Sequence, residues 1–138
     1  MRGWSLLASV LLACAGAPRF GSFVDEDTRV SNALAADACD KLATLITPES
    51  QAMQLGADAE DAFGRTLNAR LRKAGFEVWT QHRHGGALQL HYVVDQVKGS
   101  KLLRVTLYPG SEQLSRAYVR ERGRLRPAGP WVAVGGAL

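Results

Sequence analysis

The fold is decided by residues 58–76, DAEDAFGRTLNARLRKAGF, which combine a complete helix with the signal that ends it. Asp58 is a good N-cap, acidic side chains follow in the first turn, and basic side chains fill the last turn, as the helix dipole favours. Gly75 stands just after the helix, where a left-handed conformation is common. The pattern predicts a helix over residues 58–74. Its predicted buried stripe is Phe63, Leu67, Leu71 and Ala74.

After Gly75 the spacing of the apolar residues changes from about four to two, which is typical of half-buried strands. Apolar and polar side chains alternate in runs at residues 76–79, 88–95, 103–108 and 114–120. Turn-forming segments separate the runs at residues 85–86, 98–100, 109–111 and 122–123. This stretch therefore predicts an antiparallel meander.

Upstream, a second amphipathic helix is expected over residues 30–46, because apolar residues recur there at helical spacing. They are Val30, Leu34, Ala38, Leu42 and Leu45. Thr28 or Ser31 is the expected cap, and Pro48 disfavours continuation of the helix. Residues 51–55 are expected to form a short edge strand. The sequence thus predicts an α+β fold, a two-layer sandwich of two helices on a small, mostly antiparallel sheet of four to five strands.

Length and composition exclude several protein classes. A chain of 138 residues fits one domain, and its 22% charged residues with ordinary Gly and Pro usage exclude collagen, coiled coil and a mostly disordered chain. Two cysteines cannot form a disulfide scaffold. No stretch approaches the roughly 20 apolar residues that a membrane-spanning helix needs.

The N-terminus, MRGWSLLASVLLACAG at residues 1–16, resembles the signal peptide of a bacterial lipoprotein. Arg2 precedes an apolar run at residues 4–13, which has the length of a signal-peptide core and is too short to span a bilayer. The run ends in Leu11-Leu12-Ala13-Cys14, which looks like a lipobox, the motif whose Cys is acylated. The alternative is a plain secretory signal that happens to contain a Cys.

Acylation at Cys14 defines the expected organisation of the chain. Residues 1–13 are the signal peptide, 14–27 the acylated Cys and a flexible tether, 28–134 a single periplasmic α+β domain, and 135–138 a frayed tail. Two or three acyl chains would give a stable membrane anchor. Ala15 follows Cys14 where an Asp would retain a lipoprotein in the inner membrane. By resemblance to Gram-negative lipoproteins, this suggests the inner leaflet of the outer membrane, facing the periplasm.

Several short motifs follow one another along the mature chain. They are DKL at 40–42, DAFGR at 61–65, LRKAGF at 71–76, YVVD at 92–95, LSRAYV at 114–119 and PAGPWV at 127–132. Together with the lipobox-like end at Cys14, this order is similar to the TrbH family, lipoproteins of the mating-pair-formation proteins of IncP-type conjugative plasmids and related elements. The resemblance implies a non-enzymatic structural component of a type IV secretion core complex, with subunits of the secretion channel as partners.

Catalytic and metal-binding chemistry has few candidates. His82, His84 and His91 form the one histidine cluster, and Asp95 shares a strand face with His91. Their spacing matches no zinc motif, so a solvated polar loop is the preferred interpretation and no metal or cofactor is expected. Cys39 falls on the flank of the apolar stripe of its helix, which indicates packing, a buried thiol or a disulfide between chains rather than a nucleophile.

Charge is unevenly distributed, with nine acidic and two basic side chains at residues 25–61, against two acidic and eight basic ones at residues 98–126. One predicted strand face combines apolar and basic side chains, as protein interfaces do. The candidate partner-docking residues are Leu114, Arg116, Tyr118, Arg120 and Trp131. A solvated strand face is the alternative, and binding of nucleic acid, peptidoglycan or anionic lipid is less favoured.

Three functions remain open at this point. The first is a structural lipoprotein of a conjugation channel that ties its core complex to the outer membrane. The second is an envelope lipoprotein that binds or regulates cell-wall or envelope assembly proteins. The third is a small periplasmic enzyme that uses Cys39 or the histidines.

Overall fold

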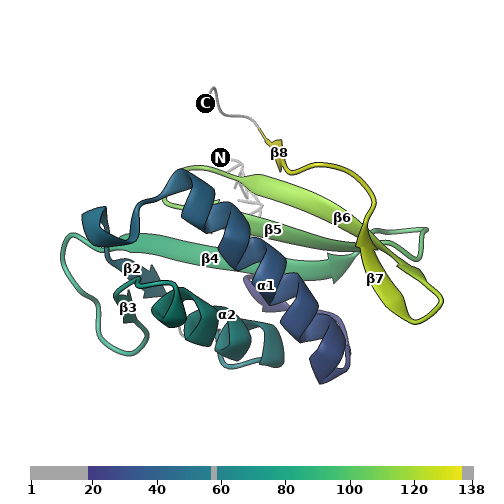
Figure 1. The fold of residues 1–138 in the computed structure, drawn as a ribbon, viewed down its shortest axis with the longest axis horizontal. Helices are drawn as coiled ribbons and strands as arrows, with labels where there is room; N and C mark the ends of the chain where they lie inside the picture. The colour runs from purple at the N-terminus through teal and green to yellow at the C-terminus, as the bar shows by residue number, and fades with distance from the viewer. Residues whose placement is uncertain (1–18, 57–58, 135–138) are drawn as a thin grey trace, which may run out of the picture.

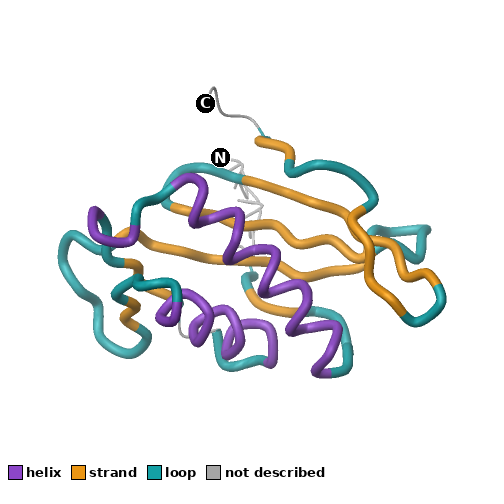
Figure 2. Tube along the Cα trace, viewed as in Figure 1, coloured by secondary structure: helices purple, strands orange, loops and turns teal. Residues whose placement is uncertain are grey.

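Two helices lie across one face of a sheet in the computed structural model, which describes residues 19–56 and 59–134 (Figures 1 and 2). The helices are α1 (Thr28–Leu45) and α2 (Ala62–Lys73), with a short 3-10 helix at Pro48–Ser50. The strands are β1 (Gly21–Ser22), β2 (Met53–Leu55), β3 (Val78–Trp79), β4 (Leu88–Gln96), β5 (Leu103–Pro109), β6 (Leu114–Glu121), β7 (Arg124–Pro127) and β8 (Val132–Ala133). The predicted α+β class is confirmed.

The sheet is larger than the sequence predicted. Its order is β3-β2-β4-β5-β6-β7, with β1 beside β4 and β8 beside β6, which makes eight strands among the described residues rather than four to five. The pairs from β4 to β8 are antiparallel, as predicted for the meander. In contrast, β1 and β2 pair in parallel with β4, and β3 pairs in parallel with β2. Strands β2 and β3 lie within the runs predicted at residues 51–55 and 76–79, whereas β1, β7 and β8 are additional and too short to show a clear alternating pattern.

Strand β2 corrects the prediction of an edge strand at residues 51–55. It lies between β3 and β4, and all three of its residues are buried. Its polar residue, Gln54, donates to the carbonyl oxygen of Trp79 and accepts from the amide of His84. A buried amide side chain with both functions satisfied can lie inside a sheet.

Both helices begin at different caps from those predicted. α2 begins at Ala62, and its N-cap is Asp61, whose carboxylate accepts from the amide of Gly64; Asp58 is outside the described residues. α1 begins at Thr28, capped by the carboxylate of Asp27. Aspartates are strong N-caps, and in each helix the acidic residue nearest to the first buried turn has that role. At the other end of α2, Gly75 has φ +97°, which confirms the predicted glycine termination.

The core is formed where the helices meet the sheet. Most of the predicted stripe residues are buried; the exceptions stand near the helix ends, where Leu45 and Ala74 are exposed and Val30 is half-buried. The buried apolar residues of the two helices are Leu34, Ala35, Ala38, Cys39, Leu42, Phe63, Leu67 and Leu71. They pack against the inward residues of β4 and β5, among them Leu90, Val94, Val105 and Leu107.

The folded domain begins earlier than the predicted tether allows. Gly21 and Ser22 pair with Val93 and Val94 of β4, and the amide of Phe23 donates to the carbonyl oxygen of Val94 at 2.7 Å. The second half of the predicted tether at 14–27 is therefore part of the fold. Residues 1–18 and 135–138 lie outside the described residues, so the signal peptide, Cys14 and the C-terminal tail stay predictions.

Asp61 joins three elements of the fold. Its Oδ1 accepts from the amide of Gly64 at 2.8 Å, and its Oδ2 accepts from the amide of Ser22 at 3.0 Å and from the hydroxyl of Tyr92 at 2.8 Å. The ring of Tyr92 also lies 4.7 Å from that of Phe63, centroid to centroid. One carboxylate thus links β1, the start of α2 and β4.

Gly64 allows this close approach, and we expect the substitution Gly64→Ala to destabilise the protein by about 1–3 kcal/mol. In an exposed helix interior, the same change would stabilise by about 1 kcal/mol. At Gly64 a Cβ atom would lie 2.6 Å from the carbonyl oxygen of Ala59 and closer still to the Tyr92 hydroxyl. Urea unfolding followed by circular dichroism measures the difference.

The matched control is Ala69→Gly at an exposed position of the same helix, which should cost only the helix propensity of about 1 kcal/mol. A Gly64→Ala variant as stable as the wild type would contradict the packing described for Asp61 and Tyr92.

Candidate docking surface

Strand β6 places the predicted docking residues on the side of the sheet that faces the helices. Leu114 and Tyr118 are 1% and 2% exposed, so they belong to the core. Trp131 is half-buried and packs against the same core. Leu114 and Tyr118 are therefore covered within the fold, contrary to the exposed position that docking requires, whereas Trp131 stays partly exposed. The sequence identified the shared face of the strand but not the helix that covers it.

Arg116 and Tyr118 converge on Asp37 of α1. Nη1 of Arg116 lies 3.1 and 2.9 Å from the two carboxylate oxygens, and the Tyr118 hydroxyl donates a short hydrogen bond to Oδ2. Nε of Arg116 donates to the carbonyl oxygen of Gly129 at 2.8 Å. The cluster therefore fastens α1 to β6 and secures the segment that leads to β8.

Burial and the hydrogen bond to Asp37 raise the pKa of Tyr118 far above its ordinary value. The phenol stays neutral in the folded protein because a phenolate would lose solvation and would repel the carboxylate. Arg116 opposes this effect only in part. The arrangement is structural, since the charge of Asp37 is neutralised within the protein.

Arg120 is paired within the chain as well. Its guanidinium forms an ion pair with Glu26, from the segment that precedes α1. Of the five predicted docking residues, Arg116 and Arg120 are the charged ones, and both have acidic partners from the N-terminal half of the domain. The uneven charge distribution along the sequence is thus partly compensated by these contacts.

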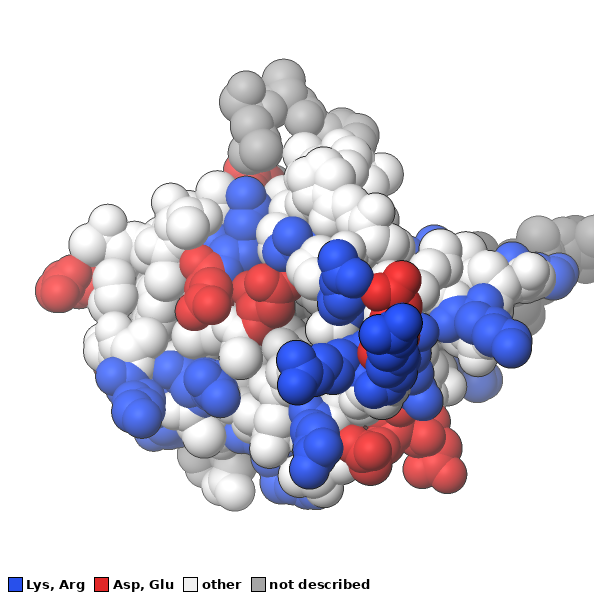
Figure 3. All heavy atoms as spheres, turned by 45° about the vertical axis from the view of Figure 1, so that its right-hand side comes forward, with Lys and Arg blue, Asp and Glu red and all other residues white. Residues whose placement is uncertain are grey.

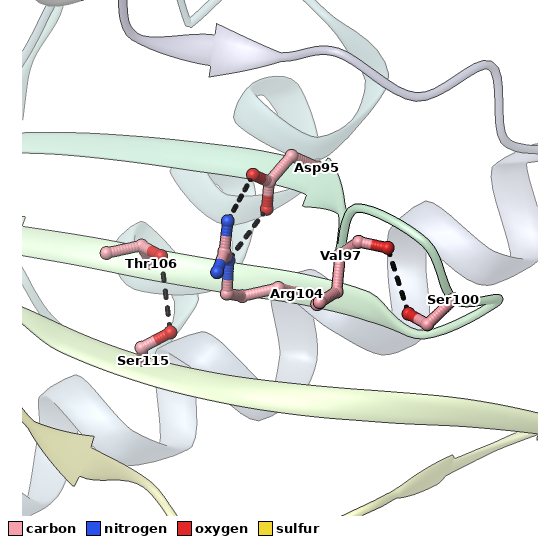
Figure 4. A network of polar contacts seen from close by, with 6 residues as sticks. All are labelled: Asp95, Val97, Ser100, Arg104, Thr106 and Ser115. Carbon is pink, nitrogen blue, oxygen red and sulfur yellow. Dashed lines mark hydrogen bonds and ion pairs between the residues drawn. The ribbon is translucent and has the colours of Figure 1, made fainter.

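The opposite face of the sheet holds a second set of polar and aromatic contacts. Arg104 binds Asp95 through two hydrogen bonds of 3.0 and 2.6 Å, and the hydroxyls of Thr106 and Ser115 lie 3.3 Å apart (Figure 4). Further along this face, Phe20 stacks on His91 with ring centroids 4.2 Å apart, and lies edge-on to Tyr108 at 5.3 Å. Sequence reasoning missed Phe20, because no local pattern signals a contact across seventy residues.

The histidines and Cys39 are separated by the fold. His84 stacks on Trp79, whereas His91 stacks on Phe20. Cys39 is buried, and this burial, followed by the charge of Asp40, raises the pKa of its thiol. Within residues 19–56 and 59–134, no group of three or more His, Cys, Asp or Glu side chains is placed to bind a metal ion. None of the helices in this part of the chain is long and apolar enough to cross a membrane.

The most exposed charges lie at the end of the sheet where β6 turns into β7. The side chains of Glu121, Arg122, Arg124 and Arg126 surround an open hollow of about 920 Å³. Figure 3 shows Lys and Arg side chains gathered on this side of the molecule, with a few acidic ones among them. We call residues 120–126 the basic hairpin. Arg122, Arg124 and Arg126 within it are exposed.

The pKa of Tyr118 leads to an expected loss of stability at high pH. A raised pKa means that the folded chain keeps its proton up to a higher pH than the unfolded chain. The contribution is complete below the ordinary tyrosine pKa of about 10 and is lost as the pH rises above it. We expect the free energy of unfolding to fall between about pH 9 and 11, and to fall less in Tyr118→Phe.

Urea unfolding at several pH values tests this expectation, in a Cys39→Ala background because the raised pKa of Cys39 acts in the same direction. At neutral pH, Tyr118→Phe should cost about 1–3 kcal/mol, since Asp37 loses a buried donor. Equal alkaline slopes for the two proteins would contradict the role described for Tyr118.

Comparison with known proteins identifies the family. The family model described as conjugal transfer protein TrbH matches residues 17–136, which include both helices and every strand described above. No curated protein and no solved structure matches the chain. The match confirms the family expected from the motifs at Asp61, Leu71 and Tyr92. The chain belongs to the TrbH family of conjugal transfer proteins.

Proposed function

We propose that this protein is a lipid-anchored structural component of a conjugal transfer apparatus. Acylated Cys14 holds it at the inner leaflet of the outer membrane, and its domain binds periplasmic or outer-membrane subunits of the secretion channel. The observation that carries the proposal is the family match over residues 17–136, which begins directly after the lipobox-like segment.

The spacing between Cys14 and the fold supports a close anchor. Phe20 contacts the sheet through His91 and Tyr108, and five residues, which make six Cα–Cα steps, lie between Phe20 and an acylated Cys14. Six extended steps reach about 20 Å at most. A short connection of this kind suits a protein that fixes other subunits near a membrane better than one that searches a large volume.

The structural role is supported by the contacts of the candidate residues. Arg116, Tyr118 and Arg120 act in internal bonds that fix the helix layer on the sheet, and the basic hairpin presents charge at one end of a firmly built domain. We assign binding of partners to this end of the domain. We extend the docking surface from Arg120 to the exposed arginines of the hairpin and leave out Leu114 and Tyr118, which are buried.

The anchor is tested in a donor strain in which a plasmid-borne copy replaces the original gene. We expect the wild-type protein to be found in the outer-membrane fraction with the intact mass of a chain acylated at Cys14. The variant Cys14→Ser should lack the acyl mass, leave the membrane fraction, and reduce plasmid transfer to the level of a strain without the protein.

The matched control is Cys39→Ser, which changes the other cysteine and should retain the acyl mass. An unmodified wild-type chain, or a Cys14→Ser variant with normal transfer and membrane retention, would refute the anchor. The proteins that co-purify with the wild type distinguish the two candidate functions. Co-purification of channel subunits agrees with the proposal, whereas co-purification of cell-wall assembly proteins would favour an envelope-binding lipoprotein instead.

A further inference from the structure

Strand β7 is the last strand at its side of the sheet, and it is short and charged. In the described part of the chain no strand pairs with its outer edge, because β8 pairs with β6 further along. Arg124, Arg126 and Pro127 are exposed. Figure 1 shows β7 and its turn projecting from the end of the sheet. An unpaired edge presents backbone groups to which another strand can bond, while short length, charge and Pro disfavour non-specific pairing.

The register between β6 and β7 shows which backbone groups face outward. The amide of Ala128 donates to the carbonyl oxygen of Ala117, and the pairs alternate from there toward the turn. Arg126 and Arg124 are therefore bonded to β6, whereas Leu125, opposite Arg120, directs its N–H and C=O groups away from the sheet. Pro127 occupies the next outward position. Proline has no backbone N–H group, but at this position an N–H would point away from β6, so no hydrogen bond to β6 is lost.

The side chains at this edge are positive and mostly unpaired. Arg124 and Arg126 stand two residues apart and so share one face of β7. Arg126 has an exposed partner in Glu121, 2.6 Å away. No ion pair or side-chain hydrogen bond within residues 19–56 and 59–134 involves Arg122 or Arg124.

At the tip of the hairpin, Arg122 has a left-handed backbone conformation that is unfavourable for arginine. Arg122 has φ +51° and Gly123 has φ +73°, the two positive values of a tight two-residue hairpin turn. The first position of such a turn normally takes Asn, Asp or Gly, and the left-handed conformation is unfavourable for other residues. Such strain at an exposed charge points to a binding role rather than to folding.

We propose that the outer edge of β7 binds an extended acidic segment of a partner protein as an added strand. Carboxylates at alternate positions of that segment pair with Arg124 and Arg126, and its backbone bonds to Leu125. The inference rests on the proposed docking role, but not on the lipid anchor. Strand addition explains why the charges lie at regular spacing on an open edge, a feature that a membrane surface or a nucleic acid does not require.

The chain contains an internal example of the same recognition. Arg120, on the opposite face of the hairpin, binds Glu26 from the extended acidic stretch Asp25-Glu26-Asp27. One side of the hairpin is thus occupied by an acidic segment of the chain itself. The other side, with Arg124 and Arg126, presents the same charge without that cover.

The test uses the full chain carrying Cys14→Ser, so that its outcome is independent of acylation. The probe is a short labelled peptide in which Glu alternates with Thr or Val, compared with a peptide of the same composition whose Glu residues are contiguous. Fluorescence anisotropy should show tighter binding of the alternating peptide. Affinity should fall as salt rises from about 0.01 M to about 0.15 M, where the screening length drops from roughly 30 Å to about 8 Å.

Hydrogen exchange separates strand addition from simple charge attraction. The amide of Leu125 should exchange rapidly in the free protein and become protected when the alternating peptide binds. The variant Arg124→Glu/Arg126→Glu should weaken binding roughly tenfold or more. The matched control, Lys73→Glu/Arg83→Glu, makes the same change in net charge at exposed positions elsewhere and should bind almost as the wild type does.

Three results would overturn the proposal. Absence of peptide binding would mean that the arginines only protect the edge against aggregation. Binding without protection of Leu125 would exclude an added strand. Equal or tighter binding to phosphatidylglycerol vesicles or to a single-stranded oligonucleotide would assign the hairpin to a lipid surface or a nucleic acid.

The hairpin tip gives an independent test, the variant Arg122→Asn. Asn tolerates the left-handed conformation, so the melting temperature should rise by about 3 °C. Peptide affinity should fall about threefold, because one arginine beside the edge is lost. A variant that is more stable and binds equally well would exclude Arg122 from the binding surface.

Discussion

The fold depends on the position of the Asp61 carboxylate, which meets the start of α2, the hydroxyl of Tyr92 and the amide of Ser22. Each of these contacts is a hydrogen bond to a charged carboxylate, and such bonds contribute about 1.5–3 kcal/mol each. Because the three bonds come from segments far apart in the sequence, they form only when the helix, the long strand and the N-terminal strand are assembled. This arrangement requires glycine at position 64, since any side chain there would displace Tyr92.

A second carboxylate, that of Asp37, also links a helix to the sheet. Asp37 of α1 binds Arg116 and Tyr118 of β6, and Arg116 also holds the carbonyl oxygen of Gly129. The two aspartates anchor one helix each, and both use a tyrosine on the inward face of the sheet. The domain therefore fixes its layers with a few directed bonds at the rim of an apolar core, which defines the crossing of helix and strand more strictly than apolar contact alone.

The sequence was sufficient for features that depend on local order. Helical spacing and alternation predicted both helices and the antiparallel meander, and Gly75 was identified as a helix end. Strand β1 was missed, and the parallel pairing of β2 with β4 and of β3 with β2 was not predicted, because these pairings are set by distant residues and not by the strands' own two or three residues. The same reason explains the docking residues: alternation put Arg116 and Tyr118 on one face, but only the packing of Asp37 reveals that this face is covered. The residues of the basic hairpin were visible as charges, whereas the left-handed Arg122 and the open edge at Leu125 are properties of the assembled sheet.

The parallel pairing of β1 has a mechanical consequence for a chain pulled from its N-terminus. Tension acts first on Gly21 and Ser22, which are joined to β4 by a few backbone bonds and to Asp61 by one amide. If these bonds, the Phe20 stack and the Glu26–Arg120 ion pair yield, residues 19–27 can span about 30 Å when fully extended, while Asp61 keeps its bonds to Gly64 and Tyr92. A two-residue strand thus acts as a release element that lengthens the connection under load and leaves the core intact.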